Sequence, residues 1–340
     1  SLTYFDAVRF PVIGKIYPDS LPFFSRIPYF LKPTTREAVW NLGQNAAGIA
    51  VRFRSDSPVI AVKWENTFNN SMKHMAPVGI KGLDLYCFID GKWRFMNSAQ
   101  PSGKTNQWQI ISGMDATERE YMLYLPLYDG IHSLQIGVAA PSHIGQPSLP
   151  YPDTRKPIVF YGSSITQGAC ASRPGMAATN LIGRKLNVET INLGFSGNAF
   201  IDYEVAEMMA HVDASAYVLD YVPNASPEQI LEKTEKFVRI LREKHPDVPL
   251  IFVEDPIFPH SKFDLRMAKE IKDKNDAMNQ AFSSLKKQGL KKIYLVKGRS
   301  LISANGESTV DGIHFTDCGF EQYVDAILPI LKKAINHKKK

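Results

Sequence analysis

The stretch P-I-V-F-Y-G-S-S-I-T-Q-G at residues 157–168 constrains the fold more than any other part of the chain. Its apolar run, residues 158–161, is typical of a buried strand and ends at Gly162, which has no Cβ and lets the backbone turn sharply. Such a turn exposes the next side chain at the carboxyl end of a sheet, where open α/β folds bind ligands. Ser163 or Ser164 is therefore a candidate nucleophile. The same residues also fit an ordinary helix N-cap, because a serine hydroxyl accepts a hydrogen bond from the first turn.

The C-terminal half continues with alternating strand and helix patterns. Apolar runs typical of strands occur at residues 158–161, 189–193, 216–220, 250–254 and 292–296. Apolar residues recur at helical spacing at residues 179–186, 227–244 and 264–288, and a last helix is expected at about 317–335. Ser226 and Pro227 form a consistent helix start. This rhythm predicts a flavodoxin-like, doubly wound parallel sheet with right-handed crossovers.

The N-terminal half has a different pattern, in which short strands dominate and helical periodicity is almost absent. Residues 48–55 and 58–65 alternate apolar and polar side chains, as half-buried strands do. Asp90-Gly91 separates strands at 84–89 and 93–97, and Asp129-Gly130 separates strands at 120–127 and 133–139. Asp-Gly pairs favour hairpins because type I′ turns need positive φ. The pattern predicts an all-β sandwich before the α/β fold.

A Pro-, Gly- and Ser-rich segment at residues 142–156 is typical of a linker between the two halves. We therefore expect a β-sandwich domain over residues 1–150 and an α/β domain over residues 151–340. A chain of 340 residues is long enough for two domains.

The composition argues against two classes of partner, nucleic acids and membranes. The net charge of +6 comes mainly from lysine-rich helix faces and the tail at 338–340, and no basic run is interleaved with aromatics, so we expect no nucleic-acid partner. No apolar run is long enough to span a membrane, so no membrane partner is expected. The N-terminus does not resemble a signal peptide, although a start at Ser1 leaves prior processing open.

Polar groups follow four of the expected strands. Ser163-Ser164 follows the first, Gly197 the second and Asn224 the third, and D-G-I-H, with Asp311 and His314, follows the fifth. Loops after parallel strands share one edge of the sheet, so these groups are expected to meet. A serine needs a neutral imidazole to take its proton, and the imidazole needs a carboxylate to fix its tautomer. Each segment alone also fits a turn or a helix start; together they predict an acyl-transfer site.

These segments resemble the blocks of the SGNH (GDSL-type) hydrolase superfamily, whose order is Ser, Gly, Asn, then Asp-x-x-His. The resemblance implies that Ser164 is the nucleophile, His314 the base and Asp311 its orienting carboxylate. It also implies an oxyanion hole formed by the N–H groups of Ser164 and Gly197 and by Asn224.

Two departures suggest a divergent subfamily: Ser163 stands where Asp is usual, and V-P-N surrounds Asn224 in place of G-x-N-D. G-L-D-L-Y at residues 82–86 resembles the G-x-D-L-Y motif of a β-domain that precedes one SGNH esterase branch. Q-G-A-C-A-S-R-P-G at residues 167–175 also resembles that branch, so the resemblance covers nearly the whole chain.

Four further residues have two interpretations each. Arg173 follows the nucleophile motif in a Pro-Gly loop and either binds a polar or acidic substrate or forms a structural ion pair. Asp84 either faces substrate or anchors a turn, and we expect the anchor. Cys170 and Cys318 either form a disulfide or remain small buried thiols, and we expect the thiols. Cys87 is also expected to be a small buried residue. The three cysteines show no C-x-x-C spacing, so neither a metal site nor a redox motif is suggested, and no cofactor is expected.

The sequence therefore predicts a serine esterase that hydrolyses small, acetyl-like esters of carbohydrates through an acyl-enzyme. The prediction that the substrate is a carbohydrate rests on analogy with the family. A thioesterase or an acyltransferase with the same residues remains open, as does a non-catalytic carbohydrate-binding protein. The expected partner is a small-molecule or oligosaccharide ester, and the expected location is the periplasm or outside the cell.

Overall fold

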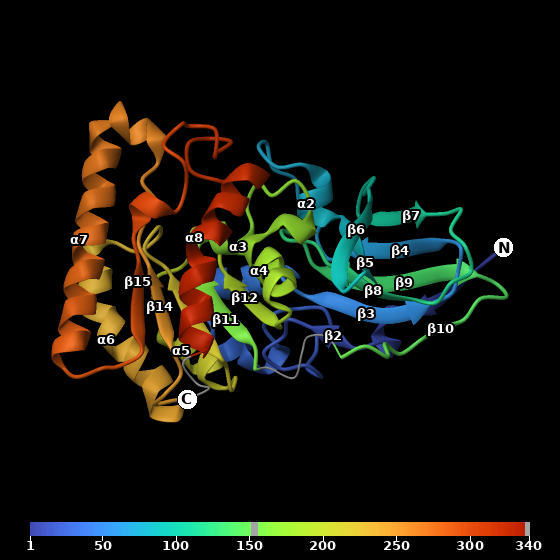
Figure 1. The fold of residues 1–340 in the computed structure, drawn as a ribbon, viewed down its shortest axis with the longest axis horizontal. Coiled ribbons are helices and arrows are strands. Elements are labelled where there is room, and N and C mark those ends of the chain that lie inside the picture. Colours follow the sequence, from blue (N-terminus) through green and yellow to red (C-terminus); the bar gives the residue numbers. More distant parts are fainter. Residues whose placement is uncertain (151–155, 337–340) are drawn as a thin grey trace.

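The computed structural model describes residues 1–150 and 156–336, and Figure 1 shows two layered regions side by side along the long axis. The N-terminal β region carries most of the antiparallel strands, and the C-terminal α/β region carries the parallel sheet and the long helices. The predicted fold class is thus confirmed. The predicted domain boundary at residue 150 borders residues that the structure does not describe, so it stays a prediction. The lysine-rich tail at 338–340 also lies outside the described residues.

The α/β region is built on a parallel sheet with strand order β12-β11-β13-β14-β15. This order is the flavodoxin-like one, in which the chain starts near the middle and winds outward in both directions. The strands are β11 (Ile158–Gly162), β12 (Thr190–Gly194), β13 (Ala216–Asp220), β14 (Leu250–Val253) and β15 (Ile293–Val296). The α-helices are α3 (Ser164–Gln167), α4 (Ala178–Leu186), α5 (Tyr203–Ala210), α6 (Pro227–Lys244), α7 (Leu265–Lys287) and α8 (Asp317–Asn336).

Side chains of the parallel strands alternate between two cores, one on each face. On β11, Val159 and Tyr161 pack into the core that α5, α6 and α7 cover. Ile158 and Phe160 pack into the opposite core with α4 and α8. Burial on both faces explains why the strand is a continuous apolar run rather than an alternating one. The predicted helix boundaries lie within about two residues of the observed ones, as expected for frayed ends.

The β region is a sandwich of two antiparallel sheets, with orders β1-β9-β4-β7 and β10-β3-β8-β5-β6, and β2 pairs with β3. Apolar side chains from both sheets, such as Phe53, Trp64 and Ile136, form one core between them. The strands are β1 (Leu2–Asp6), β2 (Val12–Ile13), β3 (Ala50–Ser55), β4 (Ile60–Asn66), β5 (Leu83–Ile89), β6 (Lys92–Ala99), β7 (Thr105–Ile111), β8 (Arg119–Tyr124), β9 (Ile131–Ala139) and β10 (Ile144–Gly145).

The first Asp-Gly pair forms the predicted hairpin and the second does not. Asp90 and Gly91 both have positive φ, and they join β5 to β6 in an antiparallel pair. Asp129-Gly130 instead joins β8 to β9, which lie in different sheets. The Asp129 carboxylate accepts hydrogen bonds from the backbone N–H groups of Phe68, Asn69 and Asn70, so it organises a neighbouring loop instead of a tight turn.

Two short α-helices in the N-terminal half escaped the sequence prediction: α1 (Glu37–Gly43) and α2 (Pro77–Lys81). Each has fewer turns than hydrophobic periodicity needs to become visible. The described residues also contain short 3₁₀ helices at Ala7–Arg9, Tyr29–Thr34, Pro174–Met176, Pro259–Lys262 and Gly298–Ser300.

The two regions share buried contacts, because residues from the β region enter both cores of the parallel sheet. Val39 and Trp40 of α1 pack with β11 and β12 side chains. Arg26 is buried and donates to the backbone carbonyls of Asn192 and Gly194 at the end of β12. Burial lowers the pKa of Arg26 to about 9, and its carbonyl partners satisfy the guanidinium without a carboxylate. The N-terminal chain thus holds the sheet edge at which the predicted site lies.

Candidate active site

The predicted site residues meet at one edge of the parallel sheet. Ser164 lies two residues after the end of β11, Gly197 follows β12 and Asn224 follows β13. These strands are neighbours in the sheet. With His314, they line a single cavity of about 340 Å³. The loops thus bring together groups that are far apart in the sequence, at the edge where α/β sheets bind ligands.

The turn after β11 requires glycine and places the two serines differently. A Cβ on Gly162 would lie 2.1 Å from Thr166 Oγ1, closer than atoms can approach. The Ser163 hydroxyl accepts a hydrogen bond from the N–H of Ile165 and caps α3. Ser164 is the first residue of that helix, and its side chain lines the cavity. The helix cap and the candidate nucleophile are therefore neighbouring serines.

A chain of hydrogen bonds runs from Ser164 through His314 to Asp311. Ser164 Oγ lies 2.9 Å from His314 Nε2, and His314 Nδ1 lies 2.6 Å from Asp311 Oδ2. A carboxylate at Nδ1 favours the tautomer with the proton on Nδ1, which leaves a lone pair at Nε2 to accept the serine proton. The geometry is that of a hydroxyl, a base and an orienting carboxylate.

The loop around Asp311 explains the D-x-x-H spacing. Asp311 Oδ1 accepts hydrogen bonds from the backbone N–H groups of Ile313 and His314, while Oδ2 contacts the ring. Burial by itself would raise the pKa of Asp311, but the hydrogen bonds from His314 and Ile313 outweigh it and lower the pKa to about 2. The carboxylate is therefore charged at every pH at which the imidazole can act as a base.

Three N–H groups were predicted to form an oxyanion hole, and their residues all line the cavity. Gly197 has φ +67°, a backbone conformation that residues with a side chain rarely adopt, and it lines the cavity. Asn224 Oδ1 accepts a hydrogen bond from the N–H of Ala199, so the amide nitrogen is the atom left for the cavity. The N–H of Ser164 lies in the first turn of α3, where helix N–H groups have no intrahelical acceptor.

The rest of the cavity lining combines apolar and charged side chains. Phe258, Met267 and Ile313 supply the apolar part. Asp255, Glu270 and Lys274 supply the charged part, and Lys274 donates to Glu270 at 2.8 Å and to the carbonyl of Pro223.

Asp255 is a charged group of this lining to which the sequence analysis assigned no role. It is buried, and among the described residues its Oδ1 atom has no hydrogen-bond partner. Burial raises the pKa of Asp255 to about 7, partly offset by Lys274. The signal that could have found it is its place in E-D-P directly after a predicted strand.

The β region also reaches the site, through His74. Its Nε2 atom lies 3.8 Å from Asp311 Oδ2, and its ring meets the His314 ring edge to face at 5.3 Å between centroids. Sequence reasoning did not single out His74, since it lies in a loop of the other half with no motif around it.

Arg173 and Asp84 contact each other across the boundary between the two regions. Arg173 donates to Asp84 at 3.0 Å and to the Tyr86 hydroxyl at 2.7 Å, and its guanidinium stacks on Phe95. Asp84 is fully buried and also accepts from Ser98 and from the N–H of Gly175. Asp84 is thus an anchor, as expected, although of the 173–175 loop rather than of a turn. A substrate contact of Arg173 stays a prediction.

The cysteines are unpaired. Cys87 and Cys170 are buried, as expected, but Cys318 is exposed, so the expectation of a buried thiol is wrong there. Burial, with a contribution from Asp311, raises the pKa of the Cys170 thiol to about 11. Cys170, His74 and His314 are the residues whose donor atoms lie close enough to hold a metal ion in the part of the chain that the structure describes.

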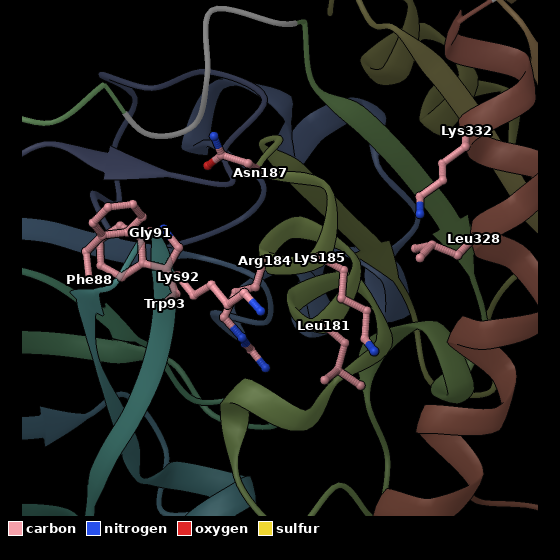
Figure 2. A pocket seen from close by; sticks show the side chains of 10 residues that line it. All are labelled: Phe88, Gly91, Lys92, Trp93, Leu181, Arg184, Lys185, Asn187, Leu328 and Lys332. Carbon is pink, nitrogen blue, oxygen red and sulfur yellow. The ribbon is translucent and has the colours of Figure 1, made fainter.

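A larger cavity, of about 620 Å³, lies between the β5–β6 hairpin and helices α4 and α8 (Figure 2). Figure 2 shows Trp93 and Phe88 on one side, Arg184 and Lys185 in the middle and Lys332 on the other side. Among the described residues, its lining contains cations and aromatic rings but no hydroxyl nucleophile, histidine or carboxylate. It therefore lacks the groups that acyl transfer needs.

Family models match both regions. The model described as a GDSL-like lipase/acylhydrolase family matches residues 155–332, and the GxDLY model, described as the N-terminus of SGNH hydrolase-type esterases, matches residues 2–144. No curated protein matches the chain. Among the described residues, no helix combines the length and apolar character needed to cross a membrane.

Solved structures share the whole architecture. A GDSL-like lipase from Bacteroides ovatus ATCC 8483 is 38% identical, with a TM-score of 0.95 over 99% of this chain and 98% of that one. A salicylyl-acyltransferase from a tetracycline biosynthetic pathway is 16% identical, with a TM-score of 0.75 over 96% and 95%. An acetyl xylan esterase from the rumen bacterium Butyrivibrio proteoclasticus is 13% identical, with a TM-score of 0.58 over 98% and 99%. The last two share the fold.

Proposed function

The chain belongs to the GDSL-like lipase/acylhydrolase family and carries the GxDLY N-terminal region of SGNH-type esterases, and from this premise we propose that it is a serine esterase that removes small acyl groups from hydroxylated substrates. The observation that carries the proposal is the hydrogen-bonded chain from Ser164 through His314 to Asp311, which opens on a cavity beside Gly197 and Asn224. The geometry supports each step of acyl transfer.

In the first half-reaction, Ser164 Oγ attacks the ester carbonyl carbon while its proton moves to His314 Nε2. Asp311 stabilises the imidazolium that forms. The carbonyl oxygen becomes negative and takes hydrogen bonds from the N–H groups of Ser164 and Gly197 and from the Asn224 amide. His314 then gives its proton to the departing alcohol oxygen, which leaves the acyl group on Ser164.

In the second half-reaction, water replaces the alcohol. His314 takes a proton from the water as its oxygen attacks the acyl carbon, and the same N–H groups hold the second oxyanion. Collapse returns the proton to Ser164 Oγ and releases the carboxylic acid. An acyltransferase would differ only here, with a second alcohol in place of water, so an added acceptor alcohol that diverts product distinguishes the two.

Two features of the cavity support a small acyl group and a hydroxylated partner. Its volume of about 340 Å³ is at the low end for ligand sites, so it does not accommodate a long acyl chain together with an alcohol. The buried Asp255 Oδ1 atom, which has no partner among the described residues, is suited to a substrate hydroxyl. Carbohydrate esters fit both features, in line with the acetyl xylan esterase of the same fold.

The proposal is tested by hydrolysis of 4-nitrophenyl acetate with the wild type, Ser164→Ala and Ser163→Ala. We expect Ser164→Ala to lose activity by at least about a thousandfold and Ser163→Ala, which loses only the helix cap, to lose far less. A fluorophosphonate should label Ser164 in the wild type, as read by mass spectrometry of the labelled peptide. Equal rates in wild type and Ser164→Ala would exclude Ser164 as nucleophile.

The substrate is tested with two series of esters. We expect activity to fall as the acyl chain of 4-nitrophenyl esters lengthens from acetate to octanoate, because the cavity is small. Acetylated sugars should be better substrates than ethyl acetate. A preference for octanoate over acetate would contradict the small acyl group, and no preference for sugar esters would contradict the hydroxylated substrate.

A further inference from the structure

Three side chains with metal-binding atoms surround the catalytic edge of the sheet. One donor atom each of His74, Cys170 and His314 lies within 4.8 Å of the other two. His74 comes from the loop between β4 and α2, Cys170 follows α3, and His314 precedes α8. The site therefore forms only where the β region packs against the α/β region.

The hydrogen bond between Asp311 and His314 prepares the imidazole for a metal as well as for a proton. With Nδ1–H held by the Asp311 carboxylate at 2.6 Å, the free lone pair is on Nε2. A carboxylate behind a histidine is the usual arrangement around metal-bound histidines, because it fixes the tautomer and raises the basicity of the ligating nitrogen. A metal ion and the Ser164 proton would compete for the same lone pair.

His74 and Cys170 supply the other two donors. The Nδ1 atom of His74 is shielded from solvent and has no hydrogen-bond partner among the described residues. The Cys170 side chain is buried and unpaired, and its backbone is held in the left-handed region at φ +69°. A metal ion binds the thiolate form of cysteine, so zinc binding releases the Cys170 proton to solvent.

We propose that His74, Cys170 and His314 form a Zn²⁺ site that inhibits the enzyme reversibly. Imidazole and thiolate donors suit Zn²⁺ and not Mg²⁺ or Ca²⁺, which take oxygen ligands. Ligand atoms around tetrahedral zinc are roughly 3.5 Å apart, so the three side chains close by about 1 Å on binding. Water occupies the fourth position. With zinc on Nε2, His314 does not accept the Ser164 proton, and acyl transfer stops.

The binding test uses calorimetry with ZnCl₂ and the tag-free, metal-free wild-type chain. We expect one ion per chain, and a Kd at least about tenfold weaker in His74→Asn and in Cys170→Ser. Cys170→Ala is a second variant in case the serine disturbs the fold.

His143→Asn and Cys318→Ser are matched controls outside the cluster, and they should bind zinc like the wild type. MgCl₂ and CaCl₂ should give no heat of binding. Equal Kd values in all variants, or no binding to the wild type, would overturn the site.

The inhibition test rests on the proposed esterase activity and uses 4-nitrophenyl acetate. Each variant is compared with its own rate in zinc-free buffer. We expect half-inhibition of the wild type near the calorimetric Kd, recovery after EDTA, and a shift of at least about tenfold in His74→Asn and Cys170→Ser. Full activity at saturating zinc would overturn the inhibition. If the chain binds zinc through these residues but hydrolyses no ester, the proposed function fails and the metal site stands.

Discussion

Two clusters of polar side chains lie where the β region meets the parallel sheet, and they differ in how completely their atoms are paired. In the Asp84 cluster, the fully buried carboxylate accepts from Ser98, Arg173 and the N–H of Gly175. In the Ser164 cluster, the hydroxyl, the imidazole and the Asn224 amide line a cavity and keep atoms available for a ligand. Complete pairing is what buried polar groups need for stability, whereas incomplete pairing beside a cavity indicates chemistry.

Loss of the imidazole gives the largest expected effect. His314→Ala removes the acceptor of the Ser164 proton, and we expect kcat for 4-nitrophenyl acetate to fall by about 10⁴- to 10⁶-fold. Because His314 is partly exposed at the cavity, thermal unfolding should change little. A loss below tenfold would mean that another group is the base. A large fall in unfolding temperature would place His314 with the Asp84 cluster instead.

Asp311→Asn should give a smaller loss, of about 10³- to 10⁴-fold in kcat. The amide can hold the imidazole in the other tautomer and does not stabilise the imidazolium, but the nucleophile and the oxyanion donors remain. The measurement is kcat beside that of His314→Ala, with Asp317→Asn as control, since Asp317 pairs with Ser172 and not with the imidazole. Undiminished activity would remove Asp311 from the mechanism.

For the Asp84 cluster we expect a loss of stability rather than a loss of kcat. Asp84→Ala leaves Arg173, Ser98 and the N–H of Gly175 without their acceptor, and we expect a loss of about 3 kcal/mol in the free energy of unfolding. Urea denaturation at pH 7 measures it, and Glu118→Ala, which breaks an ion pair at the surface, is the control with a far smaller loss.

Arg173→Met tests whether Arg173 belongs with the paired side chains around Asp84 or with the substrate site. The sequence left both a structural ion pair and a substrate contact open for it. If the ion pair is its role, Arg173→Met loses stability and keeps its KM for acetylated sugars. A raised KM with unchanged stability would favour the predicted substrate contact.

The sequence predicted the parts of the site that depend on local geometry. The strand, glycine and serine at 158–164 form a turn with few alternatives, and the D-x-x-H spacing reflects hydrogen bonds within one loop. His74 could not be predicted with equal ease, because its place beside His314 comes from packing between segments far apart in the chain. Asp255 directly follows a predicted strand, but only the packed structure shows that its Oδ1 atom has no partner among the described residues. The Asp129-Gly130 hairpin failed for a related reason: the Asp129 side chain bonds to a distant loop, and tertiary contacts override turn preference.

The smallest expected change in stability concerns Asp220. One of its carboxylate oxygens is hydrogen-bonded and the other is not, so it is less completely paired than Asp84. It ends β13, is 2% exposed, and accepts from the Tyr323 hydroxyl at Oδ2, while Oδ1 has no partner among the described residues. Burial, only partly offset by Tyr323, raises the pKa of Asp220 to about 7. In the unfolded chain the group titrates near pH 4, so ionisation disfavours the folded state increasingly as pH rises from about 4 to about 7.

Asp220→Asn removes this ionisation while it keeps an acceptor for Tyr323. We therefore expect a gain of about 1–2 kcal/mol in the free energy of unfolding at pH 8 relative to the wild type, and almost none at pH 4. Urea denaturation of both proteins across this range measures it. A gain that is independent of pH would mean that Asp220 is neutral or paired throughout, as in a fully satisfied cluster. A gain confined to high pH would show that the incompletely paired, buried carboxylate of Asp220 lowers the stability of the folded state.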